Sequence, residues 1–187
     1  MEAEDWKVPA SDYDENILSV YDNDQDGKIG SIIKRLGGGK KTAVDLGCGT
    51  GKFLPLLANH FRDVQACDYS KEMINEAKKS HKHLHNLDYN VCDLRTSAPK
   101  KRPFDIALCI NAILSSSIGD RENIWRNVRK SVRTSGHLVL VVPSLESALY
   151  SKYRLVEWNV RNGDSSKQAL TEGFETEDKN GKIISRG

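Results

Sequence analysis

The stretch that decides the fold is Val44-Asp45-Leu46-Gly47-Cys48-Gly49-Thr50-Gly51, or VDLGCGTG in one-letter code. It joins a short apolar run, residues 42–46, to a helical pattern over residues 52–60 through alternating glycines. Glycine lets the backbone turn tightly and approach a ligand without a clash at Cβ. The free N–H groups at the start of the following helix then face that ligand. The stretch therefore predicts a strand, a ligand-binding loop and a helix in succession.

Four further apolar runs predict strands. The last of them, residues 137–142, is apolar almost throughout, which is typical of a strand covered on both faces in a parallel sheet. Helical patterns lie between the runs, and a longer one follows the last run over residues 145–160. This alternation predicts an α/β fold with a doubly wound, mainly parallel sheet. The other three strand runs are residues 64–67, 89–92 and 104–110, and the helical patterns between runs are residues 52–60, 71–82 and 121–132.

The connection between the third and fourth strands differs from the others. It contains Pro99, Pro103 and the basic cluster Lys100-Lys101-Arg102. Proline cannot continue a helix interior, so we expect a loop with at most one helical turn. The basic cluster is interpreted as a solvated part of that loop. A turn is expected at Thr134-Ser135-Gly136, and Gly37-Gly38-Gly39 is expected to form a flexible joint before the first strand.

Composition excludes several classes of function. The 187 residues suit one domain, and 38% of them are hydrophobic and 29% charged. A formal net charge of +2 provides no footprint for nucleic acid or an anionic membrane. The first twenty residues do not read as a secretory signal, and the longest apolar run, residues 138–143, is too short to span a bilayer. The four cysteines include no CxxC pair, which argues against a zinc site. Each lies within or beside an apolar run, where a reduced cysteine behaves as a small hydrophobic residue, so we expect an intracellular protein, cytoplasmic or nuclear.

The run VDLGCGTG resembles the first motif of the class I, Rossmann-like, S-adenosylmethionine (SAM)-dependent methyltransferases. The competing nicotinamide fingerprint, G-x-G-x-x-G, fits less well because the third glycine, Gly51, comes one residue early. The resemblance covers about residues 40–143. It implies SAM as the cofactor and methyl transfer as the activity.

The resemblance also assigns roles along the chain. Asp68 ends the second predicted strand, where a carboxylate can accept both ribose hydroxyls; the alternative is that it caps the helix near residue 71. Tyr69 and Met73 would flank the adenine, Asp93 would accept from its amino group, and the backbone of Leu94 would reach a ring nitrogen. The expected cofactor-binding residues are Asp45, Gly47, Cys48, Gly49, Gly51, Asp68, Tyr69, Met73, Asp93, Leu94 and, beside the methionine portion, Asn111.

The methyl acceptor is not identified by the sequence. The fourth strand lacks an N-P-P-Y or D-P-P-Y run, which favours a small molecule or protein over a nucleic-acid base. No catalytic residue is assigned; residues that qualify as a base by location alone are Asp12, Tyr13, Asp14, Tyr21 and Asn111. Two alternatives stay open: aminopropyl transfer, which an acidic pair beside the fourth strand would favour and this sequence lacks, and a SAM-binding regulatory or scaffold subunit without catalysis.

The domain plan has three parts. Residues 1–36 are expected to form a helical cap over the cofactor site, at the carboxyl edge of the sheet. Residues 37–160 form the SAM-binding core, and residues 161–187 a polar tail of a shortened chain, with a possible strand only at residues 182–185. Family members usually add two strands after the fifth. Without them the fifth strand is an exposed apolar edge, so we expect a partner or a missing C-terminal segment to cover it.

Two patterns imitate metal sites. Residues 22–29 copy the start of an EF-hand loop, but position twelve, where such a loop needs a bidentate Glu, is Ile33. His81, His83 and His85 alternate after a predicted helix and are interpreted as a polar turn. No metal site is expected.

Overall fold

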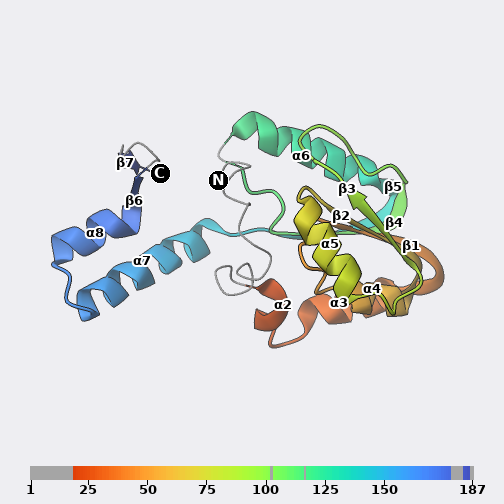
Figure 1. Ribbon diagram of the computed structural model, residues 1–187, viewed down its shortest axis with the longest axis horizontal. Helices are drawn as coiled ribbons and strands as arrows, with labels where there is room; N and C mark the ends of the chain where they lie inside the picture. The colour runs from red at the N-terminus through yellow and green to blue at the C-terminus, as the bar shows by residue number, and fades with distance from the viewer. Residues whose placement is uncertain (1–18, 102, 116, 178–182, 186–187) are drawn as a thin grey trace. The chain divides into compact units, whose positions relative to one another are not determined.

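A computed structural model of the chain describes residues 19–101, 103–115, 117–177 and 183–185 (Figure 1). The chain divides into two compact units, Met1–Val142 and Pro143–Gly187. Each is described by itself below. The helix predicted over residues 145–160 was expected in the core but belongs to the second unit.

The first unit is built on a five-stranded sheet in the order β3-β2-β1-β4-β5. Every neighbouring pair of strands is parallel, which confirms the predicted α/β architecture. The strand order reverses between β1 and β4, and in such sheets this switch point opens a crevice at the carboxyl ends of the strands. The strands are β1 Gly38–Leu46, β2 Phe61–Asp68, β3 Leu87–Val91, β4 Phe104–Ile110 and β5 Val132–Val141.

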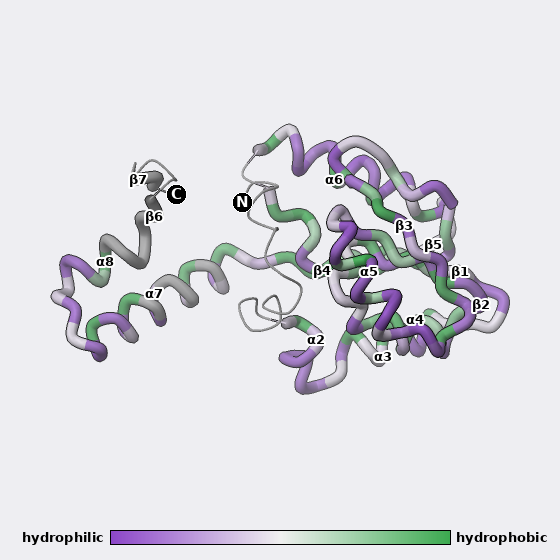
Figure 2. Tube along the Cα trace, in the orientation of Figure 1, coloured by the Kyte–Doolittle hydropathy of each residue, from purple (hydrophilic) through white to green (hydrophobic). Residues whose placement is uncertain are grey.

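Helices cover both faces of the sheet (Figure 1). On one face α3, α4 and α5 place apolar residues such as Ile33 and Leu57 against Ala43 and Ile106 of the strands. On the other face α6 packs Val128 and its neighbours against the sheet. Figure 2 shows hydrophobic residues along strands such as β4, whereas α5 and α6 carry many hydrophilic ones. The helices of this unit are α2 Val20–Asn23, α3 Lys28–Leu36, α4 Leu54–His60, α5 Lys71–Ser80 and α6 Ile118–Ser131.

Among its described residues, the connection from β3 to β4 contains no helix, as the sequence predicted. Cys92 and Leu94 are buried in the same cluster as α6, and Pro99 is fully buried. The buried side chain of Asn127 on α6 donates a hydrogen bond of 2.8 Å to the carbonyl of Leu94. The loop thus covers part of the sheet where a crossover helix would otherwise lie, and α6 holds it in place.

Four strands, β1, β2, β3 and β5, begin earlier than the apolar runs predicted. Gly38 and Gly39 belong to β1, so the expected flexible joint is wrong for these two residues. The expected turn at residues 134–136 lies inside β5 as an irregularity in its pairing with β4. A Cβ on Gly136 would lie 2.7 Å from the carbonyl of Asp105 and 2.6 Å from Val132, which explains the glycine there. Pairing with neighbouring strands therefore places in β1 and β5 polar residues that the local pattern predicted as turns.

The second unit contains α7 Leu145–Arg161, α8 Ser166–Phe174 and two short antiparallel strands, β6 Glu175–Glu177 and β7 Ile183–Ser185. A capping box between Ser144 and Ser147 starts α7, near the predicted position. The expectation that no helix or hairpin follows residue 160 is wrong. Helix α8 packs on α7 and buries Ala169 completely, a contact that the polar composition of this segment concealed.

The sheet of the first unit ends at β5, whose described residues pair with β4 alone. Leu140 in β5 is 38% exposed, and Val142 directly after it is 47% exposed. Among the strands that the structure describes, the predicted apolar edge is therefore present. Every helix in the described ranges is too short or too polar to span a bilayer.

Candidate ligand-binding site

A pocket lies at the carboxyl ends of the strands, where the strand order reverses. Four loops supply most of its wall: the glycine loop after β1 and the segments after β2, β3 and β4, with one residue each from α5 and α6. Ligands of doubly wound sheets bind at this position. The lining residues are Gly47, Gly49, Asp68, Tyr69, Ser70, Met73, Cys92, Asp93, Leu94, Arg95, Ile110, Asn111, Ala112, Leu114, Ser115 and Ile124.

The glycine loop adopts a conformation that other residues rarely adopt. Gly47, Gly49 and Gly51 all have positive φ, at 77°, 53° and 89°. A Cβ on Gly47 would lie only 2.5 Å from the Cβ of Ala112, in the loop after β4. The N–H groups of Gly47 and Cys48 both donate to the carbonyl of Cys67, at 2.8 and 2.9 Å. Glycine is thus required for the turn and for close packing of two pocket loops.

Asp68 connects the glycine loop to the start of α5. Its Oδ2 accepts from the backbone N–H of Gly49 at 2.8 Å, and its Oδ1 accepts from Ser70 at 2.8 Å. Ser70 in turn caps α5 by accepting from Met73. Burial raises the pKa of Asp68, although the backbone hydrogen bonds oppose that rise. Each carboxylate oxygen accepts more than one bond, so the local role is compatible with contact to a ligand in the pocket.

Asp45 is only 3% exposed and is not among the lining residues. Burial, with the charge of Asp68 as a second cause, raises the pKa of Asp45 to about 7. Two acidic side chains therefore lie close together on the glycine-loop side of the site. Cys48 and Gly51 also do not line the pocket, whereas the other eight residues expected to bind the cofactor do.

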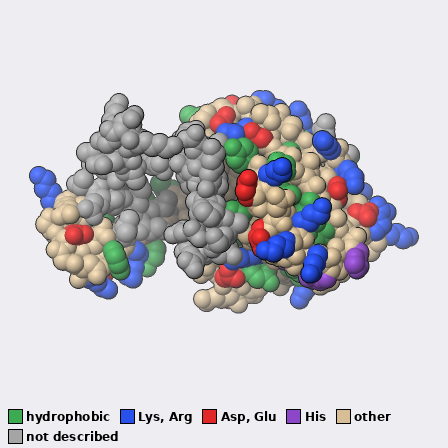
Figure 3. All heavy atoms as spheres, viewed as in Figure 1, with side chains coloured by type: hydrophobic (Ala, Val, Ile, Leu, Met, Phe, Trp, Pro, Cys, Tyr) green, Lys and Arg blue, Asp and Glu red, His purple; other side chains and the backbone are tan. Residues whose placement is uncertain are grey.

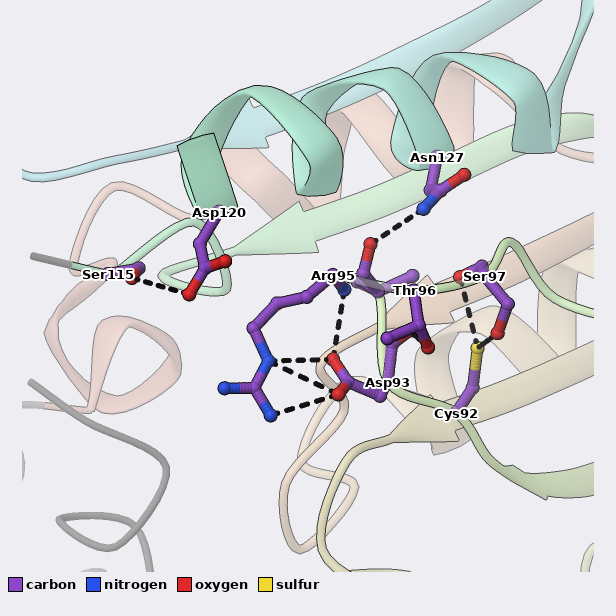
Figure 4. A network of polar contacts seen from close by, with 9 residues as sticks. Cys92, Asp93, Arg95, Thr96, Ser97, Ser115, Asp120 and Asn127 are labelled. Carbon is purple, nitrogen blue, oxygen red and sulfur yellow. Dashed lines mark hydrogen bonds and ion pairs between the residues drawn. The ribbon is translucent and has the colours of Figure 1, made fainter. Parts of the chain in front are cut away.

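Asp93 and Arg95 form an ion pair on the loop after β3 (Figure 4). Arg95 Nε lies 3.0 Å from Oδ1 of Asp93, and a terminal guanidinium nitrogen lies 2.9 Å from Oδ2. The guanidinium also lies over the ring of Tyr69, 5.3 Å from its centroid. Arg95 was not predicted, because nothing in the spacing of the loop shows that its side chain turns back toward Asp93 and the pocket.

Asn111 is the one described residue other than glycine with positive φ, at 51°. Asparagine tolerates this left-handed conformation better than most residues. Its N–H donates to the carbonyl of Val141 at 2.9 Å, and the turn brings Ala112 against Gly47. Strained backbone of this kind is found at functional sites, and Asn111 lines the pocket.

The residues considered as a base divide into three groups. Asp12, Tyr13 and Asp14 lie outside the described residues. Tyr21 on α2 packs edge-on against Phe53, with ring centroids 5.0 Å apart, and does not line the pocket. Asn111 does line it. Ser115 is a further polar group in the wall, and its Oγ lies 3.4 Å from Asp120 at the start of α6.

The side chains of the EF-hand-like segment have structural partners. Asp24 accepts from the N–H groups of Lys28 and Ile29 and so starts α3, and Asp22 forms an ion pair of 2.6 Å with Lys52. Within the described part of the chain, no three His, Cys, Asp or Glu side chains are grouped as metal ligands would be.

On the face shown in Figure 3, acidic and basic side chains are interspersed.

Comparison with known proteins places this chain in a family. Residues 43–136, half of the chain, match the family described as "Methyltransferase domain". A probable cobalt-precorrin-6B C(15)-methyltransferase (decarboxylating) from Methanothermobacter thermautotrophicus is 31% identical over 113 residues, which cover 59% of this chain and 56% of that protein. The chain thus spans about half the length of this curated relative.

Solved structures show the same fold at lower identity. The DhpI complex with SAH has a TM-score of 0.60 and 21% identity, covering 94% of this chain and 74% of that one. The sugar N-methyltransferase KedS8 from Streptoalloteichus sp. has a TM-score of 0.54 and 21% identity, covering 70% of this chain and 57% of that one. With the fold, the glycine loop and the matched segment in agreement, the chain belongs to the methyltransferase-domain family of class I SAM-dependent methyltransferases.

Proposed function

We propose that this chain binds SAM in the pocket at the switch point and transfers its methyl group to a small molecule or a protein. The observation that carries the proposal is the hydrogen bond from Gly49 to Asp68, which joins the glycine loop to a pocket carboxylate. An adenosine-containing ligand needs both elements side by side, the loop for its amino-acid portion and the carboxylate for its ribose.

The chemistry of the wall fits SAM, which carries a sulfonium cation and an ammonium group. Asp68 and Asp93 line the pocket, Asp45 lies buried close to Asp68, and Arg95 is paired with Asp93. In the proposed arrangement Asp68 accepts from the ribose and Asp93 from the adenine amino group. Tyr69 and Met73 flank the purine, and the backbone N–H of Leu94 reaches a ring nitrogen.

Bound SAM supplies an activated methyl group, and the protein supplies position. Gly47, Gly49 and Asn111 would hold the methionine portion at the ends of β1 and β4. Holding two reactants in line can contribute roughly 7–11 kcal/mol to lowering the barrier. The main role of the residues named here is therefore to bind and orient.

The proposed acceptor class has two supports. The segment after β4 reads Asn-Ala-Ile-Leu and lacks the proline pair associated with amino groups of nucleic-acid bases. The names of the relatives describe action on a cobalt-precorrin and on a sugar. We also propose an intracellular location, cytoplasmic or nuclear, because all four cysteines are free thiols and three of them are buried.

The test uses SAM labelled in its methyl group, added with the protein to a cell extract, with labelled products identified by mass spectrometry. The expected result is one labelled small molecule or protein whose labelling is lost in Gly47→Ala. The matched control is Gly39→Ala, because a Cβ there meets no atom within 4 Å. Binding of SAM without label transfer to any acceptor would instead identify a non-catalytic SAM-binding subunit.

A further inference from the structure

Arg95 occupies the pocket wall between two acidic groups of different elements. It contacts the carboxylate of Asp93 on its own loop, and Asp120 at the start of α6 adds a second favourable charge (Figure 4). Its guanidinium lies over the ring of Tyr69. The guanidinium thus touches two residues that the proposed function places around the purine.

The contact between Arg95 and Asp93 engages both carboxylate oxygens. Oδ1 accepts from the backbone N–H and from Nε of Arg95, at 2.9 and 3.0 Å, and Oδ2 accepts from the terminal nitrogen at 2.9 Å. Partial burial would raise the pKa of Asp93, but the hydrogen bonds and charge of Arg95 outweigh it and lower that pKa. Arginine has hydrogen-bond donors and no acceptor, so both oxygens of Asp93 act as acceptors in this pair.

The loop that bears the pair is itself fixed. The carbonyl of Asp93 accepts from the N–H groups of Thr96 and Ser97, each at 3.0 Å. Asn127 on α6 holds the carbonyl of Leu94, the residue between the pair. Asp93 is therefore restrained by its backbone on one side and by the guanidinium on the other.

We propose that Arg95 is the positioning residue that makes the purine end of the pocket selective for a base with a 6-amino group. It clamps both oxygens of Asp93 in one orientation, with only acceptor lone pairs left for the ligand. This inference rests on the proposed function, since it requires the adenine of SAM to lie beside Asp93. Arg95 acts through Asp93 and is not assigned to the methyl transfer.

The selectivity follows from the direction of one hydrogen bond. The 6-amino group of adenine donates to an acceptor-only Asp93. The 6-oxo group of hypoxanthine is itself an acceptor, so it cannot bond to Asp93 and instead sets two acceptor oxygens against each other. A site whose hydrogen-bond direction matches one ligand and opposes the other discriminates between them by the loss of that hydrogen bond. Without the guanidinium, the carboxylate of Asp93 is free to rotate and no longer holds its acceptor lone pairs toward the 6-position of the purine.

The test compares two ligands by calorimetry on the full chain: S-adenosylhomocysteine and S-inosylhomocysteine, its 6-oxo analogue. Wild type should prefer the 6-amino ligand by roughly 10- to 100-fold, the range for one charge-assisted hydrogen bond. Arg95→Gln should lower that ratio about 3- to 10-fold, and Arg95→Lys, which keeps the charge but not the paired geometry, should lie between. Arg62→Gln is the matched control, because Arg62 forms an exposed ion pair with Asp63 outside the pocket, and it should keep the wild-type ratio.

The outcomes separate the two proposals. If wild type binds neither ligand, the proposed function is overturned, and this inference with it. If wild type binds the 6-amino ligand and Arg95→Gln keeps its selectivity, only the role of Arg95 is overturned. Tighter binding of both ligands by Arg95→Gln would also contradict it, since the guanidinium would then compete with the purine for Tyr69. A purely structural role would weaken both ligands equally and leave the ratio unchanged, which likewise overturns the proposal.

Discussion

The backbone N–H of Gly49 donates a hydrogen bond of 2.8 Å to Oδ2 of Asp68. The glycine loop after β1 and the carboxylate that ends β2 are therefore one unit, although nineteen residues separate them along the chain. A substitution at Asp68 should therefore also change the conformation of the glycine loop.

Asp68→Ala should weaken SAM binding by roughly 10- to 1000-fold, since charge-assisted hydrogen bonds contribute about 1.5–3 kcal/mol each. Part of this loss comes from the freed N–H groups of Gly49 and Ser70. Asp68→Asn should do less damage, because its amide oxygen still accepts. Asp63→Ala, at the exposed start of the same strand, is the control and should bind as wild type does.

A ligand that lacks the ribose hydroxyls separates the two contributions of Asp68. The 2′,3′-dideoxy analogue of SAM should bind wild type poorly and should show little further loss in Asp68→Ala. If the two losses in binding free energy simply add, Asp68 does not touch the ribose. Its role is then confined to the glycine loop and the start of α5.

Gly47→Ala should lower the free energy of unfolding by about 1–3 kcal/mol, because it adds a Cβ at φ 77°. The new Cβ would also lie 2.5 Å from Ala112, so the two pocket loops must separate and SAH affinity should fall. Thermal denaturation and calorimetry measure the two effects. Wild-type stability in Gly47→Ala, or an equal loss in the control Gly39→Ala, would contradict this explanation of the loop.

The pKa of about 7 at Asp45 lies above the ordinary value of 3.8, so the folded state binds this proton more tightly than the unfolded state. The stability contributed by the proton is complete below pH 4 and is lost as pH rises through 7. Between pH 6 and 8 the free energy of unfolding of the ligand-free protein should fall by roughly 1 kcal/mol on this account. Chemical denaturation of wild type and Asp45→Asn should show this fall in wild type alone; parallel curves would refute it.

Calcium should leave the melting temperature unchanged, because the carboxylate of Asp24 already accepts from the first N–H groups of α3 and Asp22 already pairs with Lys52. Asp24→Ala should destabilise the protein by about 1 kcal/mol, with or without calcium, because the N–H groups of Lys28 and Ile29 at the start of α3 lose their acceptor. A calcium-dependent rise in melting temperature that Asp22→Ala and Asp24→Ala abolish would show instead that this segment binds the ion.

The sequence predicted the parts of the fold that local patterns determine. Phe104–Ile110 has the predicted bounds because Pro103 and Asn111 punctuate an apolar run. The early starts of β1 and β5 could not be predicted, since polar residues join those strands only through pairing with neighbours. Helix α8 escaped prediction because, among those of its side chains that the structure describes, only Ala169 is buried.

The candidate site divides in the same way. Motif positions on strand ends, such as Asp68 and Asp93, were expected in the pocket wall because parallel strands end at one edge of the sheet. Arg95 was not expected, because the direction of a long side chain depends on its rotamer and on the shape of its loop. Asp45 belongs to the glycine-loop motif and was expected to bind the cofactor, but it is buried and does not line the pocket.

The most direct test of the central claim is calorimetric titration of the full chain with SAM, with SAH and with NAD. A class I methyltransferase pocket should bind SAM and SAH at a single site, and NAD should give no binding heat above dilution. Gly47→Ala and Asp68→Ala should each weaken the SAM isotherm, while Gly39→Ala and Asp63→Ala leave it unchanged. Binding of NAD together with no binding of SAM or SAH would contradict the account.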